Sequence, residues 1–222
     1  MLAPVTLILV LLTAAAAYLR RRLRRLPARL VIVSPRESTV VAGDGRVRSK
    51  QSAELTFAPA ELDRIWGPAN LENLGRTYWL FLSRVTLGLI RVVYSENTRS
   101  VVLLCRPLTL LRFEAPEYTI EPGHGAVLWR VKDGLLVARS GRGSGYLALD
   151  VRRDADDAQG RVRLRIAAEV SNFYPSIAVG FGIPVYRMTQ SALHVLVTHS
   201  FLRSLAKLRL AESKVGSLAG QS

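Results

Sequence analysis

A succession of short apolar segments between residues 87 and 170 is the feature that most constrains the fold. The segments either alternate apolar with polar side chains or are rich in β-branched residues, which is typical of strands with one buried face. Their sequences are LGLIRVVY, SVVLLC, LTLLRF, EYTIE, AVLWRV, LLVAR, GYLALDVRR and RVRLRIAAEV. Turn signals separate them, including Pro122 with Gly123 and the glycines of 141–145. We therefore expect antiparallel strands in succession, with a tight hairpin at Lys132-Asp133-Gly134.

Helical patterns flank this run on both sides. SAELTF, beginning at Ser52, predicts a first strand, and a helix over 58–66 should follow because Pro59 stands near its start. A second helix is expected over 70–84. After the strands, residues 185–210 contain no Gly or Pro, and their apolar residues recur at helical spacing: Met188, Ala192, Val195, Leu202 and Leu205. An α+β fold follows, with a curved antiparallel sheet wrapped on a long C-terminal helix.

The N-terminus has a different character. Residues 2–19, LAPVTLILVLLTAAAAYL, carry no charge. At helical rise this run spans ~27 Å, which covers a bilayer core, and Tyr18 stands where an interfacial aromatic residue is expected. We predict a transmembrane helix over 1–19.

The charges beside this run predict its orientation. No Lys or Arg precedes it, and six arginines follow: Arg20, Arg21, Arg22, Arg24, Arg25 and Arg29. The positive-inside rule places the N-terminus outside and the main domain in the cytoplasm, as a single-pass protein of the cell membrane. A cleaved signal is the alternative, because TAAAAY offers small residues for cleavage.

The arginines have two interpretations at the membrane surface. They act as the stop signal that determines topology, or they also attract anionic headgroups with ~1 kcal/mol for each basic residue. Nucleic acid is not an expected partner, although the formal charge is +14, because no aromatic residues are interleaved with the arginines. We expect a basic juxtamembrane tether over 20–51 with a short strand at 30–33, a folded domain over 52–210 and a flexible tail over 211–222.

One stretch carries a family resemblance. LTFAPAELDRIW, residues 55–66, resembles the first strand and following helix of the START-like (SRPBCC, helix-grip) superfamily, and the later strands and long helix extend the likeness over 52–210. RTYWLFLSRVTLGLI departs from the family by being longer and more apolar than the usual link. The resemblance implies a cavity between sheet and helix that binds lipids or other apolar molecules. Some members are enzymes, and no universal catalytic residue can be transferred.

A polar stripe on the long helix is the candidate ligand site. Tyr186, Gln190, His194 and Thr198 recur every four residues, so they share one helix face. Either this face meets solvent, or it faces the cavity and orients the polar end of a ligand. Arg76, Tyr78 and Trp79, near the mouth of the expected cavity, could complement the stripe, although the sequence does not place them.

Other chemistry finds little support in the sequence. His194 is the one candidate for acid–base work in a cyclase or hydratase of the same fold. His194 and His199 are five residues apart and face different ways on a helix, so neither a metal nor a cofactor is expected; His124, in EPGHGA, should be an exposed turn residue. A single cysteine excludes an intramolecular disulfide. The leading hypothesis is a membrane-tethered module that binds an apolar ligand. The alternatives are the enzyme and a structural partner of a membrane protein.

Overall fold

A computed structural model describes residues 30–33, 39–63, 66–103, 108–154, 160–174, 192–205 and 210–211. Within these residues, ten strands form one antiparallel sheet. The strands are β1 (Leu30–Ile32), β2 (Thr39–Val41), β3 (Val47–Phe57), β4 (Ile90–Tyr94), β5 (Thr98–Leu103), β6 (Thr109–Glu114), β7 (Glu117–Glu121), β8 (His124–Asp133), β9 (Tyr146–Asp154) and β10 (Val162–Phe173). The described helices are α2 (Pro59–Asp63), α3 (Pro68–Val85), the short 3-10 helix η1 (Arg139–Gly141) and α6 (Ala192–Leu205).

The strand order places the two ends of the domain side by side. The main path is β1-β3-β10-β9-β8-β6-β5-β4, while β2 also pairs with β3, and β7 pairs with β8. The long strands β3 and β10 are neighbours although most of the domain separates them in sequence. β4, β5 and β6 are successive antiparallel neighbours, and so are β7, β8, β9 and β10, as the alternating pattern predicted; β6 and β7 each pair with β8. The expected α+β class with a mostly antiparallel curved sheet and a C-terminal helix is confirmed.

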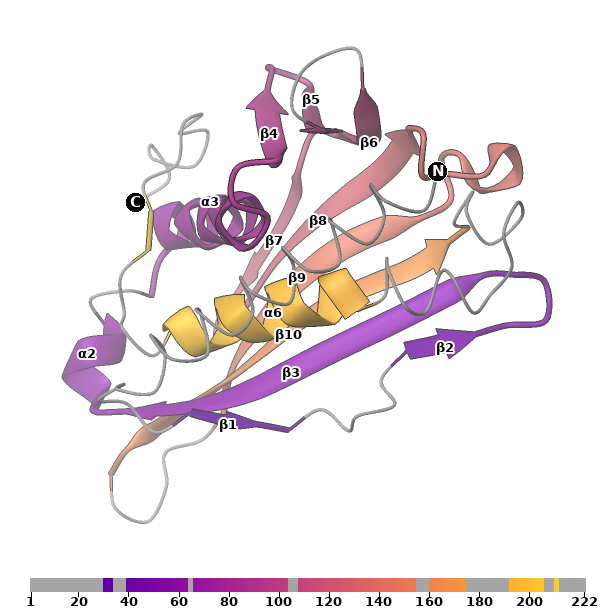
Figure 1. The fold of residues 1–222 in the computed structure, drawn as a ribbon. Coiled ribbons are helices and arrows are strands. Elements are labelled where there is room, and N and C mark those ends of the chain that lie inside the picture. Colours follow the sequence, from indigo (N-terminus) through magenta and orange to yellow (C-terminus); the bar gives the residue numbers. More distant parts are fainter. Residues whose placement is uncertain are drawn as a thin grey trace.

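The helices cover one face of this sheet. Figure 1 shows α6 lying along β3 and β10, with α3 between α6 and β4. α3 begins at Pro68, whose missing N–H is harmless in a first turn. Its buried residues Leu71, Leu74, Tyr78 and Val85 follow helical spacing, so α3 presents an apolar stripe to the sheet.

Alternation along the strands separates an apolar inner face from a charged outer face. On β9, Leu147, Leu149 and Val151 are buried, and the residues between them are not. The outer face carries cross-strand ion pairs, including Arg48 Nε to Glu169 Oε1 at 2.9 Å and Arg130 Nε to Glu117 Oε1 at 2.6 Å. Such exposed pairs contribute little stability, so the inner face supplies most of it.

Two predictions about the β8–β9 connection are wrong. LLVAR was expected to form a strand, but the connection from Gly134 to Gly145 contains turns and η1. The expected tight hairpin at residues 132–134 is also missing. Gly134 has φ 145°, and a Cβ there would lie 2.3 Å from the Leu110 carbonyl oxygen. The chain therefore turns toward β6 instead of reversing onto β9, and Leu135 N donates to Thr109 O at 3.1 Å.

Part of the segment predicted as a tether belongs to the sheet. β1 lies where a short strand was expected, and β2 pairs beside it on the same edge of β3. β3 itself begins at Val47, before the expected domain start at Ser52. Three-residue strands carry too little pattern to be recognised alone, and the long edge of β3 supplies their hydrogen-bond partners.

Other predictions fall at the limits of the described chain. The C-terminal helix was expected over 185–210; α6 covers 192–205, and residues 175–191 lie outside the described residues. The predicted membrane span over 1–19 lies outside them too, and no helix within them is long and apolar enough to cross a bilayer.

Candidate functional site

An apolar cavity lies between the inner face of the sheet and the two long helices. We call it cavity A; its volume is about 130 Å³. Its walls come from α3, α6 and the inner face of the sheet, from β4, β5 and β6 through β8, β9 and β10 to Ser49 of β3. The residues that line it include Tyr78, Trp79, Val101, Phe113, Val131 and Val197.

Cavity A contains a buried donor that has no hydrogen-bond partner among the described residues. Trp79 is only 3% exposed, and its indole N–H donates to no group within the described part of the chain. The ring itself is held firmly, because its centroid lies 5.1 Å from that of Trp129 and 5.4 Å from that of Phe113. A buried indole N–H usually finds a partner, so its isolation in a cavity wall indicates a position for an acceptor.

The Tyr78 phenol lies beside this donor, and the Thr198 hydroxyl lies near the phenol. Burial raises the pKa of the Tyr78 phenol to about 12, and the nearby Thr198 hydroxyl opposes part of the rise. The Thr198 Oγ1 atom is fully buried and forms no hydrogen bond within the described residues. Thr198 therefore lies near the Tyr78 phenol without a hydrogen bond to it. Both phenol and hydroxyl stay neutral at physiological pH.

A second cavity lies at the other end of the same interface. We call it cavity B; its volume is about 270 Å³. The residues that line it include Leu55, Trp66, Leu71, Leu74, Ile166 and Leu205. Of the buried polar atoms without a partner in the described chain, none belongs to a residue of its wall.

A layer of large side chains divides the two cavities. On β8, Gly125 lines cavity B and Val131 lines cavity A, with Trp129 between them. The Trp129 indole packs on α3 so closely that a Cβ on Gly75 would lie 2.9 Å from its Cζ2 atom. Glycine at position 75 is therefore required for this contact. We call Gly75, Trp129 and Phe201 the dividing layer.

Phe201 completes this layer from the opposite helix. On α6, Val197 lines cavity A and Leu205 lines cavity B, with the fully buried Phe201 between them. The ring centroids of Phe201 and Tyr78 are 5.3 Å apart in an edge-to-face arrangement. Aromatic rings from both helices and the sheet thus separate the cavities.

A polar pair also links α6 to the sheet. His199 Nε2 lies 2.8 Å from the Gln51 Oε1 atom, so the imidazole donates there in its neutral form. Burial lowers the pKa of His199, and the charge of Arg203 adds to the decrease. This histidine therefore positions α6 and offers no free acid at neutral pH.

His124 does not behave as the sequence predicted. It was expected to be exposed in a turn, but it begins β8 and is half-buried, with Nε2 2.7 Å from Asp150 Oδ2. Asp150 also accepts from Arg152 Nε at 3.0 Å. His124 pairs directly with Arg152 across the strands at the outer face of the sheet, and at the start of β8 it also lines cavity B. Its imidazole is therefore held by the Asp150 carboxylate.

The polar stripe predicted on the long helix is described in part. Thr198 is fully buried, which excludes the solvent-facing alternative for that residue. His194 lies in α6, but the structure does not describe its side chain. Tyr186, Gln190 and the arginines of 20–29 lie outside the described residues. The enzyme alternative based on His194 stays a prediction. The sequence suggested Arg76, Tyr78 and Trp79 as residues near the cavity mouth without placing them, and the structure puts Tyr78 and Trp79 in the wall of cavity A. YWLFL indicated burial, but no local signal shows which ring faces a cavity.

Comparisons with known proteins give only distant similarities. No family model and no curated protein matches the chain. A conserved protein from Geobacillus kaustophilus aligns with a TM-score of 0.34 and 13% identity, covering 72% of this chain and 95% of that one. Ara h 8.0201 aligns at 0.33 and 10%, covering 73% and 99%. Human STARD10 aligns at 0.34 and 10%, covering 86% and 78%. Similarities this low carry no argument about activity, and the fold is defined by the strand order described above.

Proposed function

We propose that this chain is a membrane-tethered START-like domain that binds an apolar small molecule carrying a hydrogen-bond acceptor. The observation that carries the proposal is the buried N–H of Trp79, which has no partner within the described chain, in the apolar wall of cavity A. Ligand sites are mostly apolar and contain a few placed polar groups. Trp79 supplies a donor, so the complementary ligand offers a carbonyl, ester, ether or hydroxyl oxygen.

The size of cavity A defines what part of a ligand it takes. An apolar cavity of about 150 Å³ stays dry and binds a benzene-sized molecule. Cavity A, at about 130 Å³, therefore accommodates one small ring or the end of an acyl chain. A carbonyl on that group meets Trp79, while the rest of a larger ligand extends beyond the cavity.

The proposed tether suits such a ligand. The uncharged run of 2–19 and the arginines after it support a single-pass anchor with the domain at the cytoplasmic face. Molecules of this class concentrate in the bilayer, and tethering raises the effective concentration of the domain beside them.

A matched pair of ring compounds tests the role of the Trp79 N–H. Cyclohexanone and methylcyclohexane have similar size, but only the ketone accepts a hydrogen bond. We expect Trp79→Phe to weaken cyclohexanone binding about 2–10-fold more than methylcyclohexane binding, because one net hydrogen bond contributes about 0.5–1.5 kcal/mol. Cyclohexanone should also shift one indole N–H resonance in NMR spectra of the full chain, the resonance that Trp79→Phe removes.

Trp66→Phe is the control, because Trp66 lines cavity B. It should leave the ratio of the two affinities unchanged. If Trp79→Phe weakens the binding of both compounds equally, the proposal that the ligand carries a hydrogen-bond acceptor for Trp79 is wrong. If neither ring compound binds the wild-type chain, the ligand-binding function is wrong. That result would favour the alternative that the chain is a structural partner of a membrane protein.

The membrane orientation has its own test. A C-terminal reporter that is active only in the cytoplasm should function on the full chain, because the arginines follow the apolar run. Moving two of them in front of Leu2 should weaken this preference. A reporter that is active only outside the cytoplasm would contradict the proposed topology.

A further inference from the structure

Exposed leucines mark the end of the domain where β6 begins and β8 ends. Leu108 is 43% exposed, and Leu135 is 58% exposed. They are neighbours, because the Leu135 N–H donates to the carbonyl of Thr109. Large apolar side chains that are exposed side by side on two connections form a small patch rather than scattered single residues.

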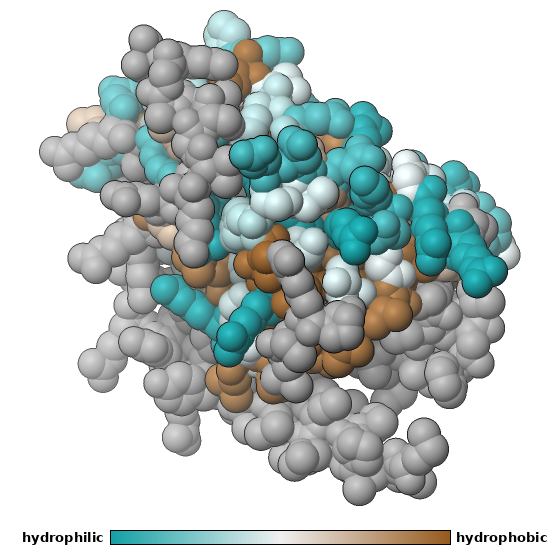
Figure 2. Space-filling model, turned by 90° about the horizontal axis from the view of Figure 1, so that it is seen from above, coloured by the Kyte–Doolittle hydropathy of each residue, from teal (hydrophilic) through white to brown (hydrophobic). Residues whose placement is uncertain are grey.

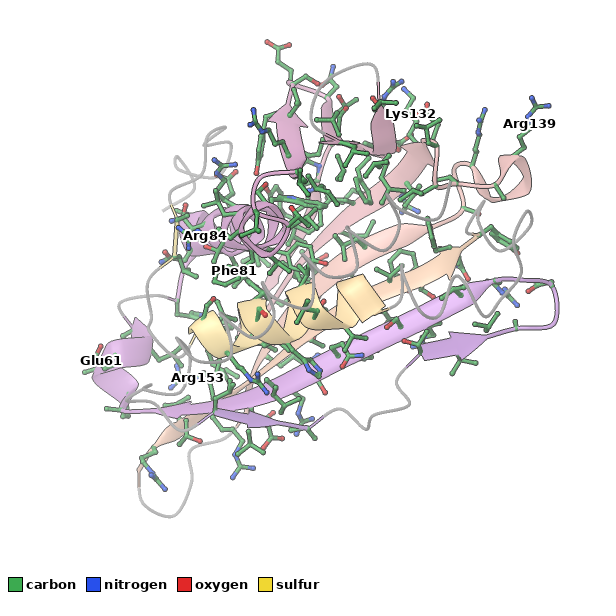
Figure 3. All side chains as sticks on the ribbon, in the orientation of Figure 1. Glu61, Phe81, Arg84, Lys132, Arg139 and Arg153 are labelled. Carbon is green, nitrogen blue, oxygen red and sulfur yellow. The ribbon has the colours of Figure 1, made fainter. Side chains whose placement is uncertain are left out.

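Basic side chains surround these leucines. Lys132, Arg139 and Arg142 are exposed, and within the described part of the chain no carboxylate forms an ion pair with any of them. Elsewhere on the sheet comparable arginines are paired, such as Arg130 with Glu117. Figure 3 shows Lys132 and Arg139 at this end, with Arg139 projecting outward from the β8–β9 connection. We call Leu108, Leu135, Lys132, Arg139 and Arg142 the leucine–arginine surface.

The leucine–arginine surface adjoins cavity A. Leu110 and Leu136 line that cavity, and each follows a member of the surface closely in sequence. Leu136 N donates to the carbonyl of Leu110 at 3.0 Å, so the two connections are joined at the cavity wall. Figure 2, which views the molecule from above, shows hydrophobic residues exposed between hydrophilic ones on this side.

We propose that the leucine–arginine surface docks on an anionic lipid surface and brings the wall of cavity A to the bilayer. Two leucines insert at the level of the headgroups, and three cations that form no ion pair within the described residues meet lipid phosphates. A protein partner would need a larger apolar area than these two side chains supply. The docking itself needs no ligand, but its use in ligand transfer rests on the proposed function.

A fluorescent probe on the full chain tests this orientation. The chain, with Cys105→Ser and Leu135→Cys, is labelled with an NBD dye and reconstituted in vesicles of phosphatidylcholine and phosphatidylglycerol in equal parts. Lipids with a spin label in the acyl chain should quench the dye strongly. The same dye on Ile120→Cys should be quenched little, because Ile120 is exposed but pairs with Gly125 at the opposite end of β8.

Charge reversal supplies the second arm. Replacing Lys132, Arg139 and Arg142 by Glu should reduce the equilibrium constant for docking roughly five-fold for each residue that is replaced. In the wild-type chain, vesicles of neutral phosphatidylcholine alone should also reduce docking. Arg139→Glu alone is the milder variant, since its side chain points into solvent; unchanged thermal midpoints show that the variants fold.

The outcomes separate the two proposals. Equal quenching at positions 135 and 120, or quenching that resists charge reversal, overturns the docking surface. Cyclohexanone binding is measured separately, with the chain in neutral bilayers, so that ligand binding is tested without docking. If the ring binds while docking fails, the proposed function stands and this inference falls. If docking holds while no ring binds, the surface stands and the ligand-binding function falls.

Discussion

Cavities A and B share the same sheet and helices but differ in what a ligand would meet. Cavity B has about 270 Å³ and cavity A about 130 Å³. Cavity A nevertheless holds the Tyr78 phenol and the buried Trp79 N–H, which has no partner within the described residues. The lining of cavity B combines leucine and isoleucine side chains with Asn70, Glu121 and His124, and none of its residues has a buried polar atom without a described partner. Volume alone would select cavity B as the site. The comparison teaches that an unmet hydrogen-bond requirement is the more specific indication of a ligand.

The dividing layer keeps this difference in place. Trp129 reaches across from the sheet to Gly75, and Phe201 reaches from α6 to Tyr78. These rings lie between the residues that line the two cavities on β8 and on α6.

Removing one ring of the layer should have the largest effect. Phe201→Ala is expected to lower the free energy of unfolding by about 3–5 kcal/mol, because a fully buried phenyl ring leaves a cavity that neighbours fill only partly. Urea unfolding measures this change. Phe201→Leu should cost much less, and Val40→Ala, at an exposed position on β2, should change stability by less than about 0.5 kcal/mol. A loss below 1 kcal/mol in Phe201→Ala would show that the layer is not a packed core.

The phenol beside cavity A should cause a loss of stability at alkaline pH. Burial raises the pKa of Tyr78 from 10.0 to about 12, so the unfolded chain releases its proton first. Stability from this group is complete below pH 10 and falls as the pH rises toward 12, by about 2–3 kcal/mol. Tyr78→Phe should reduce this slope, while the part due to Tyr118, whose pKa is also raised to about 12 by burial, should remain. Chemical unfolding at a series of pH values measures it, and an unchanged slope would contradict a buried phenol.

The His199–Gln51 pair should give the smallest effect, on the acid side. Burial lowers the pKa of His199 below its ordinary value of 6.5, so the unfolded chain takes up a proton first as the pH falls. The stability that this group contributes is complete above pH 6.5 and decreases below it. His199→Gln keeps a donor for Gln51 without titration and should flatten this part of the profile. A profile that is identical in both chains would show that His199 does not titrate with unfolding.

The sequence by itself determined the elements. Alternation placed β7 at residues 117–121 and β9 and β10 within a few residues, and the second helix expected over 70–84 agrees with α3 within two residues. These features depend on neighbours within one or two turns of chain, so a local pattern contains them. The polar stripe also located Thr198 on a helix, although nothing local showed that its hydroxyl would be fully buried.

Only the tertiary structure decided the site. Gly134 turned the chain toward Leu110 because of a close backbone contact across strands, and β1 and β2 formed because β3 offered an open edge. Trp79 faces a cavity because Trp129 and Phe113, far away in sequence, occupy the other sides of its ring. A cavity is the space that distant side chains leave unfilled, and its shape depends on packing between elements that no single segment encodes.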